Sequence, residues 1–215
     1  MQDSTTREKV LKKIRNALIS KTANPYPNLD FDSPVFRMND EVPELIFAQA
    51  FKEAGGQFVF CNTMLDFAEG LLNLAQTKKW TQLLCVESPL FKFLNECEFP
   101  LSNDPSTIST THASVTLCEC LVARTGSIMV SSAQTAGRGI PLFTPVHIVV
   151  AFPGQLVDDL KDAFNFIKSK YKDNTPSSTT FITGPSSTAD IGNELVIGAQ
   201  GPSELYLFLV DKPEW

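Results

Sequence analysis

Segments with the patterns of helices and strands alternate from Pro43 onward, and this alternation constrains the fold more than any other feature of the chain. Pro43 suits a first helical turn, and Gly55-Gly56 ends that helix before a strand-like segment. The helices are predicted at 43–50, 63–77 and 88–95, and the strands between them at 57–61 and 81–86. Helices that connect successive parallel strands cover the faces of the sheet. We therefore predict an α/β fold in which a mostly parallel sheet is sandwiched by helices.

Residues 1–42 have a different character. Ser4 or Thr5 can cap a helix whose apolar residues repeat on one face, at Val10, Leu11, Ile14 and Leu18. Residues 21–40 are rich in Pro, Asn and Asp without any period, which predicts an extended linker. The helix is either an arm that packs on a partner subunit of a homo-oligomer or a helix that lies over its own domain. We divide the chain into an N-terminal helix and linker, 1–42, and one domain, 43–215.

A polar loop between two apolar, β-rich runs is the first candidate binding element. The runs lie at 127–130 and 146–152, and the loop carries Gly137, Arg138 and Gly139. Glycines let the backbone approach a ligand closely, and an arginine offers several donors to a carboxylate or phosphate. We predict that this loop lies at a sheet edge and binds a small anion.

Two further polar segments are expected to face the same cleft as that loop. The segment after a strand predicted at 179–183 contributes Gly184, Ser186, Ser187, Thr188 and Asp190. Its hydroxyls suit a phosphate or carboxylate, and Asp190 either holds the loop by an Asx turn or binds a ribose hydroxyl. Thr125, Gly126 and Ser127 form either a turn that accepts an anion or a turn that is only structural.

Glu119 and His147 are the titratable candidates. Glu119 lies among apolar residues in VTLCECL, where a carboxylate needs a partner or serves as an acid, base or nucleophile. Alternatively, it sits at the rim of the sheet or pairs with Arg124 or Arg138. His147 enters an apolar strand, either as a satisfied core histidine or as a polar end of the cleft. Cys118 and Cys120 alone do not complete a zinc site, so we predict no bound metal.

Composition excludes several classes of protein. The formal net charge of −6 and the pI near 5.0 disfavour nucleic-acid binding, which depends on Lys and Arg at phosphates. No apolar run approaches the roughly 20 residues of a membrane span, and the N-terminus lacks the pattern of a secretory signal. The odd number of cysteines, five, suits reduced thiols better than disulfides. We therefore expect a cytoplasmic protein.

Four sequence segments carry a resemblance to a known family. They are VTLCECL, VARTGSIMVSS, PLFTPVHIVVA and TGPSSTADIGNELVIGAQGPSELYLFLV, which together span most of 114–210. These segments resemble the LUD domain, specifically the short lactate-utilisation protein C family. The resemblance implies a fold similar to the group of ribose-5-phosphate isomerase, glucosamine-phosphate deaminase and CoA-transferase, with 5-formyltetrahydrofolate cyclo-ligase also near.

The resemblance also implies that the gene for this protein lies in an operon whose iron–sulphur proteins oxidise L-lactate to pyruvate. No C-x-x-C motif occurs in the chain, so we expect no cofactor here and an iron–sulphur cluster only in partner proteins. The leading hypothesis is an accessory or binding subunit of that system, with a small anion in the predicted cleft. The alternative is a free-standing enzyme that acts on a phosphorylated or CoA-linked substrate, with Glu119 as the catalytic carboxylate.

Overall fold

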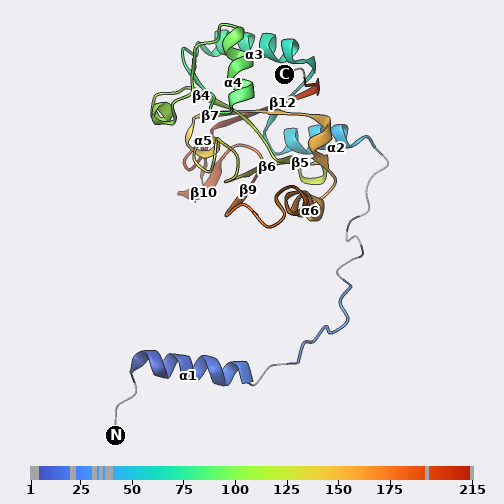
Figure 1. The fold of residues 1–215 in the computed structure, drawn as a ribbon, viewed down its shortest axis with the longest axis vertical. Coiled ribbons are helices and arrows are strands. Elements are labelled where there is room, and N and C mark those ends of the chain that lie inside the picture. The colour runs from blue at the N-terminus through green and yellow to red at the C-terminus, as the bar shows by residue number, and fades with distance from the viewer. Residues whose placement is uncertain are drawn as a thin grey trace. The chain divides into compact units, whose positions relative to one another are not determined.

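The computed structural model describes residues 5–19, 23–30, 33, 36, 41–191 and 194–213. The chain divides into two units, Met1–Asn39 and Asp40–Trp215. The first contains the predicted helix, α1 (Thr6–Ile19) (Figure 1). Thr5 and Glu8 cap this helix by reciprocal hydrogen bonds between side chains and backbone amides. Ser4, the other candidate cap, and much of the predicted linker lie outside the described residues.

A six-stranded sheet, in which every pairing is parallel, forms the centre of the second unit. In spatial order its strands are β1 (Gln57–Thr63), β12 (Glu204–Lys212), β7 (Val146–Ala151), β4 (Ala113–Leu117), β2 (Leu83–Leu84) and β3 (Leu101–Ser102). Buried parallel strands have continuous apolar sequences, which explains why β7 was recognisable as an apolar run in the sequence. The predicted α/β fold with a mostly parallel sheet is confirmed.

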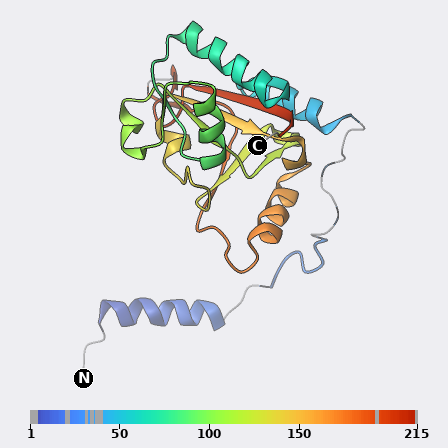
Figure 2. The same ribbon diagram turned by 45° about the horizontal axis from the view of Figure 1, so that its top comes forward.

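Two helices cover one face of this sheet, α3 (Met64–Lys78) and α4 (Ser88–Glu96). Thr63 and Asp66 form a capping box at the start of α3, so the helix begins directly where β1 ends. Phe67 of α3 packs edge-on against Phe208 of β12, with ring centroids 5.1 Å apart. In Figure 2 the red strand β12 runs between the teal helix α3 and the orange helix α6 (Leu160–Tyr171).

The other face of the parallel sheet packs against a second, four-stranded sheet and against α2 (Pro43–Glu53). The strands of this second sheet, in spatial order, are β8 (Leu156–Val157), β5 (Cys120–Val122), β6 (Ser127–Ser131) and β9 (Thr179–Ile182). Helix α6 covers its far face through Ala163 and Ile167. The domain is therefore built in layers. Helices α3 and α4 form one outer layer, the two sheets lie inside, and α6 forms the other outer layer.

The second sheet corrects one detail of the prediction. The apolar runs at 127–130 and 146–152 belong to different sheets, so the expected common sheet edge is wrong. The chain passes between the sheets within VTLCECL, because β4 ends at Leu117 in one sheet and β5 begins at Cys120 in the other. Helix α6 begins at Leu160, where Asp159 and Asp162 form its capping box.

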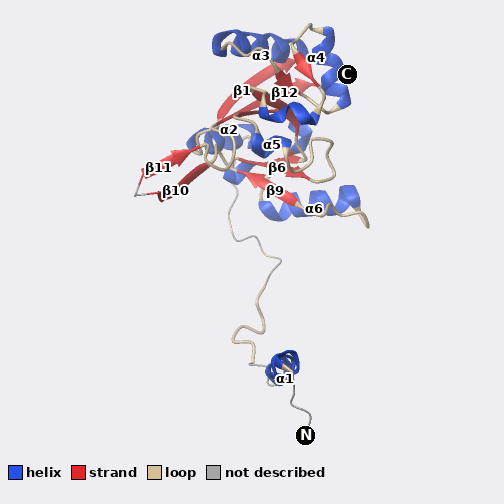
Figure 3. Cartoon of the chain, turned by 90° about the vertical axis from the view of Figure 1, so that its left-hand side faces the viewer, coloured by secondary structure: helices blue, strands red, loops and turns tan. Residues whose placement is uncertain are grey.

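A two-stranded hairpin projects from the domain, formed by β10 (Ser187–Ile191) and β11 (Glu194–Ile197) (Figure 3). The predicted loop at 184–190 is therefore a strand from Ser187 onward. The remaining elements are α5 (Ile140–Phe143) and the short 3-10 helices η1 (Pro105–Ser109), η2 (Ala123–Thr125) and η3 (Pro153–Gln155). Within the described ranges, no helix has both the length and the apolar character needed to cross a membrane.

Candidate functional site

A cavity of about 390 Å³ opens at the carboxyl ends of the parallel strands β2, β4 and β7. We call it the strand-end cavity; it is lined by Glu87, Ser88, Pro89, Leu117, Cys118, Ala133, Gln134, Thr135, Phe152, Gln155 and Lys170. In open α/β sheets, ligands bind at this end of the strands because loops and helix N-termini converge there. The position of the cavity therefore agrees with the general rule for the fold class.

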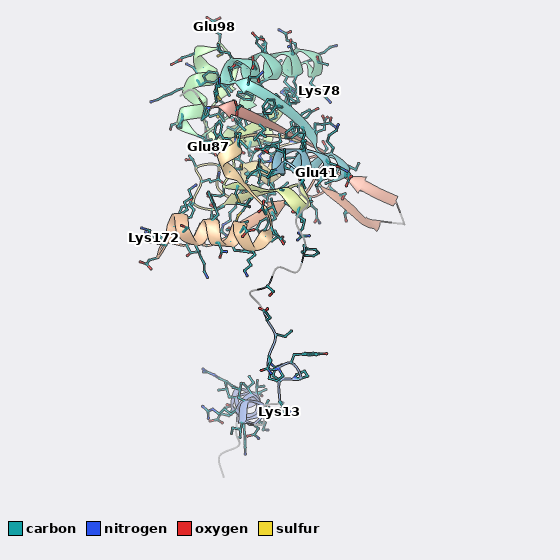
Figure 4. The ribbon with its side chains drawn as sticks, turned by 90° about the vertical axis from the view of Figure 1, so that its right-hand side faces the viewer. Lys13, Glu41, Lys78, Glu87, Glu98 and Lys172 are labelled. Carbon is teal, nitrogen blue, oxygen red and sulfur yellow. The ribbon has the colours of Figure 1, made fainter. Side chains whose placement is uncertain are left out.

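A larger cavity, of about 650 Å³, lies at the opposite, amino ends of β1 and β12. Its charged side chains include Lys78 and Glu204, which pair at 2.8 Å, and Tyr206 donates a further hydrogen bond to Glu204. Figure 4 shows Lys78 and Glu87 on opposite sides of the domain. We consider the smaller cavity the better candidate site, because one of its lining residues has a buried carboxylate for which no hydrogen-bond partner lies among the described residues.

That carboxylate is Glu87, which directly follows β2 and is the N-cap residue of α4. Its side chain is 6% exposed, and among the described residues neither carboxylate oxygen has a hydrogen-bond partner. Burial raises the pKa of Glu87 to about 7, although the nearby main-chain amides of Leu117 and Ala136 oppose part of the rise. A buried carboxyl without a partner is costly, so its position at a cavity suggests a functional role.

Lys170 of α6 is the cationic residue in the lining of the strand-end cavity. Helix α6 covers the second sheet, so this residue comes from a different layer than Glu87. Its Nζ lies 2.7 Å from Oε2 of Glu119. Burial lowers the pKa of Lys170, but the hydrogen bond and the charge of Glu119 outweigh this effect and raise it. The lysine is therefore charged and remains 46% exposed, so it can contact a ligand while it holds Glu119.

Glu119, the predicted catalytic residue, lies behind this lysine and has no exposed surface. Ser131 Oγ and Tyr171 Oη donate to its Oε1 at 2.5 and 2.8 Å, and Lys170 donates to Oε2. The alternative partners expected from the sequence, Arg124 and Arg138, are not the ones in these contacts. Because its oxygens accept three hydrogen bonds, Glu119 fixes the position of Lys170 and does not line the cavity.

The N-terminus of α4 is the third feature of the strand-end cavity, contributed by Ser88 and Pro89. The first intrahelical hydrogen bond runs from Phe91 N to Glu87 O, at 2.8 Å. The amides before Phe91 therefore have no acceptor inside the helix, and the positive end of the helix dipole faces this region. A helix N-terminus and an ammonium group at one cavity form a favourable environment for a small anion.

The structure separates the predicted loops from one another. Arg138 is exposed, and its Nη2 donates to Ser177 Oγ at 2.8 Å, near the start of β9. Gly184 and Ser186 follow the opposite end of β9, where a Cβ on Gly184 would lie less than 3.0 Å from Ala54 O. Arg138 and Ser186 therefore contact different segments, and neither lines the strand-end cavity, so a common cleft for them stays a prediction. Gly137 and Gly139 flank Arg138, and their predicted contact with a ligand stays a prediction.

The segment after β9 contacts the hairpin and the amino-end cavity. The backbone of Ser186 bonds with Pro202 O and Gly198 N, and Ser187 lines the larger cavity beside Glu204. Thr188 lies in β10 and pairs with Val196 of β11. Asp190 also lies in β10, but its side chain is outside the described part of the chain, so its predicted role stays a prediction.

Thr125, Gly126 and Ser127 form a tightly packed turn between η2 and β6. Thr125 and Thr183 hydroxyls each lie 2.7 Å from Ser127 Oγ, so the three side chains form a chain of hydrogen bonds. Gly126 has a φ of +60°, and a Cβ there would overlap the backbone of Phe51 in α2. These contacts support the structural alternative for the turn, since the glycine permits the close approach of α2.

His147 is fully buried in β7, and its Nε2 lies 2.8 Å from Thr116 Oγ1 of β4. Its Nδ1 has no partner among the described residues, and burial lowers its pKa to about 3. A neutral histidine held in this way is a core residue and not an end of the strand-end cavity, whose lining does not include it.

Sequence reasoning missed the two charged residues that line the strand-end cavity. Glu87 carried a usable signal, because it stands between a predicted strand and a Ser-Pro helix start, where strand-end ligands bind. Lys170 carried none, since a lysine near the end of a helix is explained by the helix dipole alone. Only the packing of α6 against the second sheet brings this lysine to the cavity.

Comparisons with known proteins show what parts of this chain are similar to. The sequence pattern of the LUD domain matches residues 106–210. Proteins named lactate utilization protein C from Bacillus licheniformis and Bacillus subtilis are 31% and 30% identical to this chain over 99 and 98 residues. Each match covers 45% of this chain and 41% of the relative, so the chain spans less than half the length of these relatives.

A solved structure shows the same fold. It is the crystal structure of a DUF162 family protein from Deinococcus radiodurans, which superimposes with a TM-score of 0.61 at 15% sequence identity. The match covers 78% of this chain and 96% of the other. Together, these comparisons show that residues 106–210 of this chain match the LUD domain and that the fold is similar to that of a DUF162 family protein.

Proposed function

We propose that this protein takes part in lactate utilisation as a binding subunit that holds a small carboxylate in the strand-end cavity. The observation that carries the proposal is the cavity itself, where the Lys170 ammonium and the N-terminus of α4 meet at the carboxyl ends of the strands. The names of the relatives, lactate utilization protein C, support this choice of pathway. The iron–sulphur proteins that oxidise L-lactate to pyruvate are the proposed partners, and the redox cofactors belong to them.

The lining of the cavity suits a ligand of the size and chemistry of lactate. A volume of about 390 Å³ lies in the range of small-molecule sites. Leu117, Phe152 and Pro89 supply apolar surface for a methyl group, while Lys170 supplies a charge-assisted donor for a carboxylate. The site is therefore expected to bind L-lactate, pyruvate or a similar small anion.

Isothermal titration of the full chain with L-lactate, pyruvate and inorganic phosphate tests this site. Because removal of Lys170 alone leaves Glu119 buried without its cation, the sharper variant is the double substitution Lys170→Met/Glu119→Gln. We expect it to bind at least about tenfold more weakly, since a charge-assisted hydrogen bond contributes about 1.5–3 kcal/mol. Lys168→Met, an exposed lysine on the same helix, is the matched control. No binding of any of the three anions would refute the site.

Co-purification tests the proposed partners. The tagged chain, recovered from its native cells grown on lactate, should bring down iron–sulphur proteins with their clusters. The same purification from cells grown without lactate provides the control for expression. Recovery of the chain alone from lactate-grown cells, with intact clusters elsewhere in the lysate, would contradict the subunit role.

The alternative is an enzyme that acts on a phosphorylated or CoA-linked substrate. The buried residue Glu87 favours this alternative, because it is among the residues that line the cavity and Glu119 is not. A thermal-shift screen with sugar phosphates, CoA esters and folates should then reveal a stabilising ligand, and Glu87→Gln should reduce its turnover. An absence of shifts across that panel, with a shift from L-lactate, would leave the binding subunit as the better account.

A further inference from the structure

Helix α1 presents an apolar stripe that its own unit does not cover. Successive residues of an α-helix are turned by about 100°, so Val10, Leu11, Ile14 and Leu18 lie on one stripe about 100° wide. Leu11, Ile14 and Leu18 are 40%, 49% and 63% exposed, and within α1 no residue is buried. A single helix of this length is only marginally stable in water, so α1 needs a surface that covers the stripe.

The charges of α1 indicate the chemistry of that surface. The helix contains five basic residues and one acidic residue, although the whole chain has a formal net charge of −6. Lys13 and Arg15 lie beside the two edges of the apolar stripe, and Lys9 and Lys12 lie on the opposite face. The remaining basic residue, Arg7, lies at the N-terminal end of the stripe. This distribution complements a surface that combines apolar groups with negative charge.

Two features favour an anionic lipid surface over a groove in another protein. A groove that held the stripe would not contact Lys9 and Lys12, whereas the potential of an anionic membrane extends over a Debye length of about 8 Å. The helix is only about 10–12 Å across, so these lysines contribute to the attraction. The stripe is also wholly aliphatic, while the residues that dominate protein interfaces are enriched in Trp, Tyr and Arg.

We propose that α1 lies in the plane of an anionic lipid surface and attaches the chain to it. The apolar stripe enters the boundary between headgroups and acyl chains, and the basic side chains bind the lipid phosphates. Lys13 and Arg15 reach those phosphates while their methylene groups stay in apolar contact. This attachment needs no membrane-spanning segment, and it goes beyond the proposed function because it involves no residue of the strand-end cavity.

The acidic remainder of the chain does not oppose this attachment. Residues 20–42 join α1 to α2, and an extended chain of that length spans up to about 75 Å. Repulsion between the lipid surface and the carboxylates of the second unit is screened beyond about 8 Å at physiological ionic strength. The chain is therefore long enough for α1 to bind the surface while the second unit stays outside the range of that repulsion.

Sedimentation of the full chain with lipid vesicles tests the charge requirement. We expect binding to phosphatidylcholine vesicles with about 40% phosphatidylglycerol, no binding to phosphatidylcholine alone, and release as salt rises from about 0.1 to 1 M. Lys12→Gln/Lys13→Gln should weaken binding about 25-fold, since each basic residue near the surface contributes about fivefold. Lys92→Gln/Lys168→Gln makes the same charge change at exposed lysines of the second unit and should bind as the parent.

A second pair of variants tests the apolar stripe. Ile14→Gln replaces a stripe residue by a polar one of good helix propensity and should weaken binding at least about tenfold. Ile14→Leu keeps the stripe apolar and should bind as the parent. Equal binding of Ile14→Gln and the parent would show that the stripe does not enter the lipid, and this result would overturn the inference.

The remaining outcomes identify other occupants of the stripe, and each would overturn the inference. If the chain binds neither kind of vesicle and Ile14→Gln loses a co-purifying protein, α1 is an arm for that protein. If vesicle binding is absent and Ile14→Gln lowers the free energy of unfolding in urea, α1 packs on its own chain. Titration with L-lactate depends on none of these residues, so the failure of this inference can be distinguished from the failure of the proposed function.

Discussion

Replacement of Glu87 by glutamine should change how the stability of the free protein depends on pH. The folded-state pKa of Glu87, about 7, lies above its value in the unfolded chain, about 4.5. Between these values the folded state binds more protons than the unfolded state, so stability falls as the pH rises from about 4.5 through 7. Glu87→Gln has no ionisable group at this position and should lose this decline.

The magnitude follows from the same two values. One pKa unit corresponds to about 1.4 kcal/mol, so the rise from 4.5 to about 7 corresponds to about 3 kcal/mol. The free energy of unfolding of Glu87→Gln, relative to the parent, should therefore increase by about 3 kcal/mol between about pH 4.5 and pH 8. His147, whose pKa is lowered to about 3, destabilises both proteins equally below about pH 6.5, so it cancels in the difference.

Urea unfolding of both proteins at a series of pH values between these limits measures the difference. The slopes with urea must agree between parent and variant, since the comparison assumes the same exposed surface on unfolding. Glu96→Gln, at the other end of α4, controls for loss of one negative charge. A difference between Glu87→Gln and the parent that stays constant to within about 0.5 kcal/mol over this range would refute the reasoning, because the carboxyl would then ionise equally easily in both states.

Two further predictions concern packing and the buried network. Gly126→Ala should cost at least about 3 kcal/mol because its Cβ meets the backbone of Phe51, whereas Gly137→Ala, also at positive φ but with open space around it, should cost only about 1 kcal/mol. Equal losses of unfolding free energy in urea for the two variants would show that backbone strain alone, and not the contact with Phe51, determines the cost of each. Glu119→Ala should cost about 3–5 kcal/mol and the isosteric Glu119→Gln about 1–3 kcal/mol. Thermal unfolding that ranks the glutamine variant as the less stable would contradict the network.

The sequence was most informative where local pattern and burial agree. The alternation of segments from Pro43 and the start of α3 predict the parallel sheet and its helices. The second sheet was not predictable in this way, because a buried strand has the same apolar pattern in either sheet. The run through Cys118 and Glu119 appears continuous in the sequence, and only its pairing with β6 and β8 shows that the chain changes sheets there.

The position of the candidate cavity was predictable from the fold class, but its lining residues were not. An anion site at the strand ends was expected for this fold, yet Arg138 and Ser186 were combined by their chemistry alone. Which segments these two residues contact depends on the pairing and direction of β9, which no local pattern gives. Glu119 was correctly identified as a carboxylate that needs partners, but the identity of the cation, Lys170, depends on how α6 packs.

The strand-end cavity draws its charged groups from two different layers of the domain. Glu87 and α4 belong to the layer of the parallel sheet, while Lys170 belongs to the helix that covers the second sheet. A ligand that contacts both layers links them and opposes their separation. Binding of a ligand in the strand-end cavity should then slow amide hydrogen exchange beyond the contacted residues, in both α4 and α6, which share no direct backbone pairing.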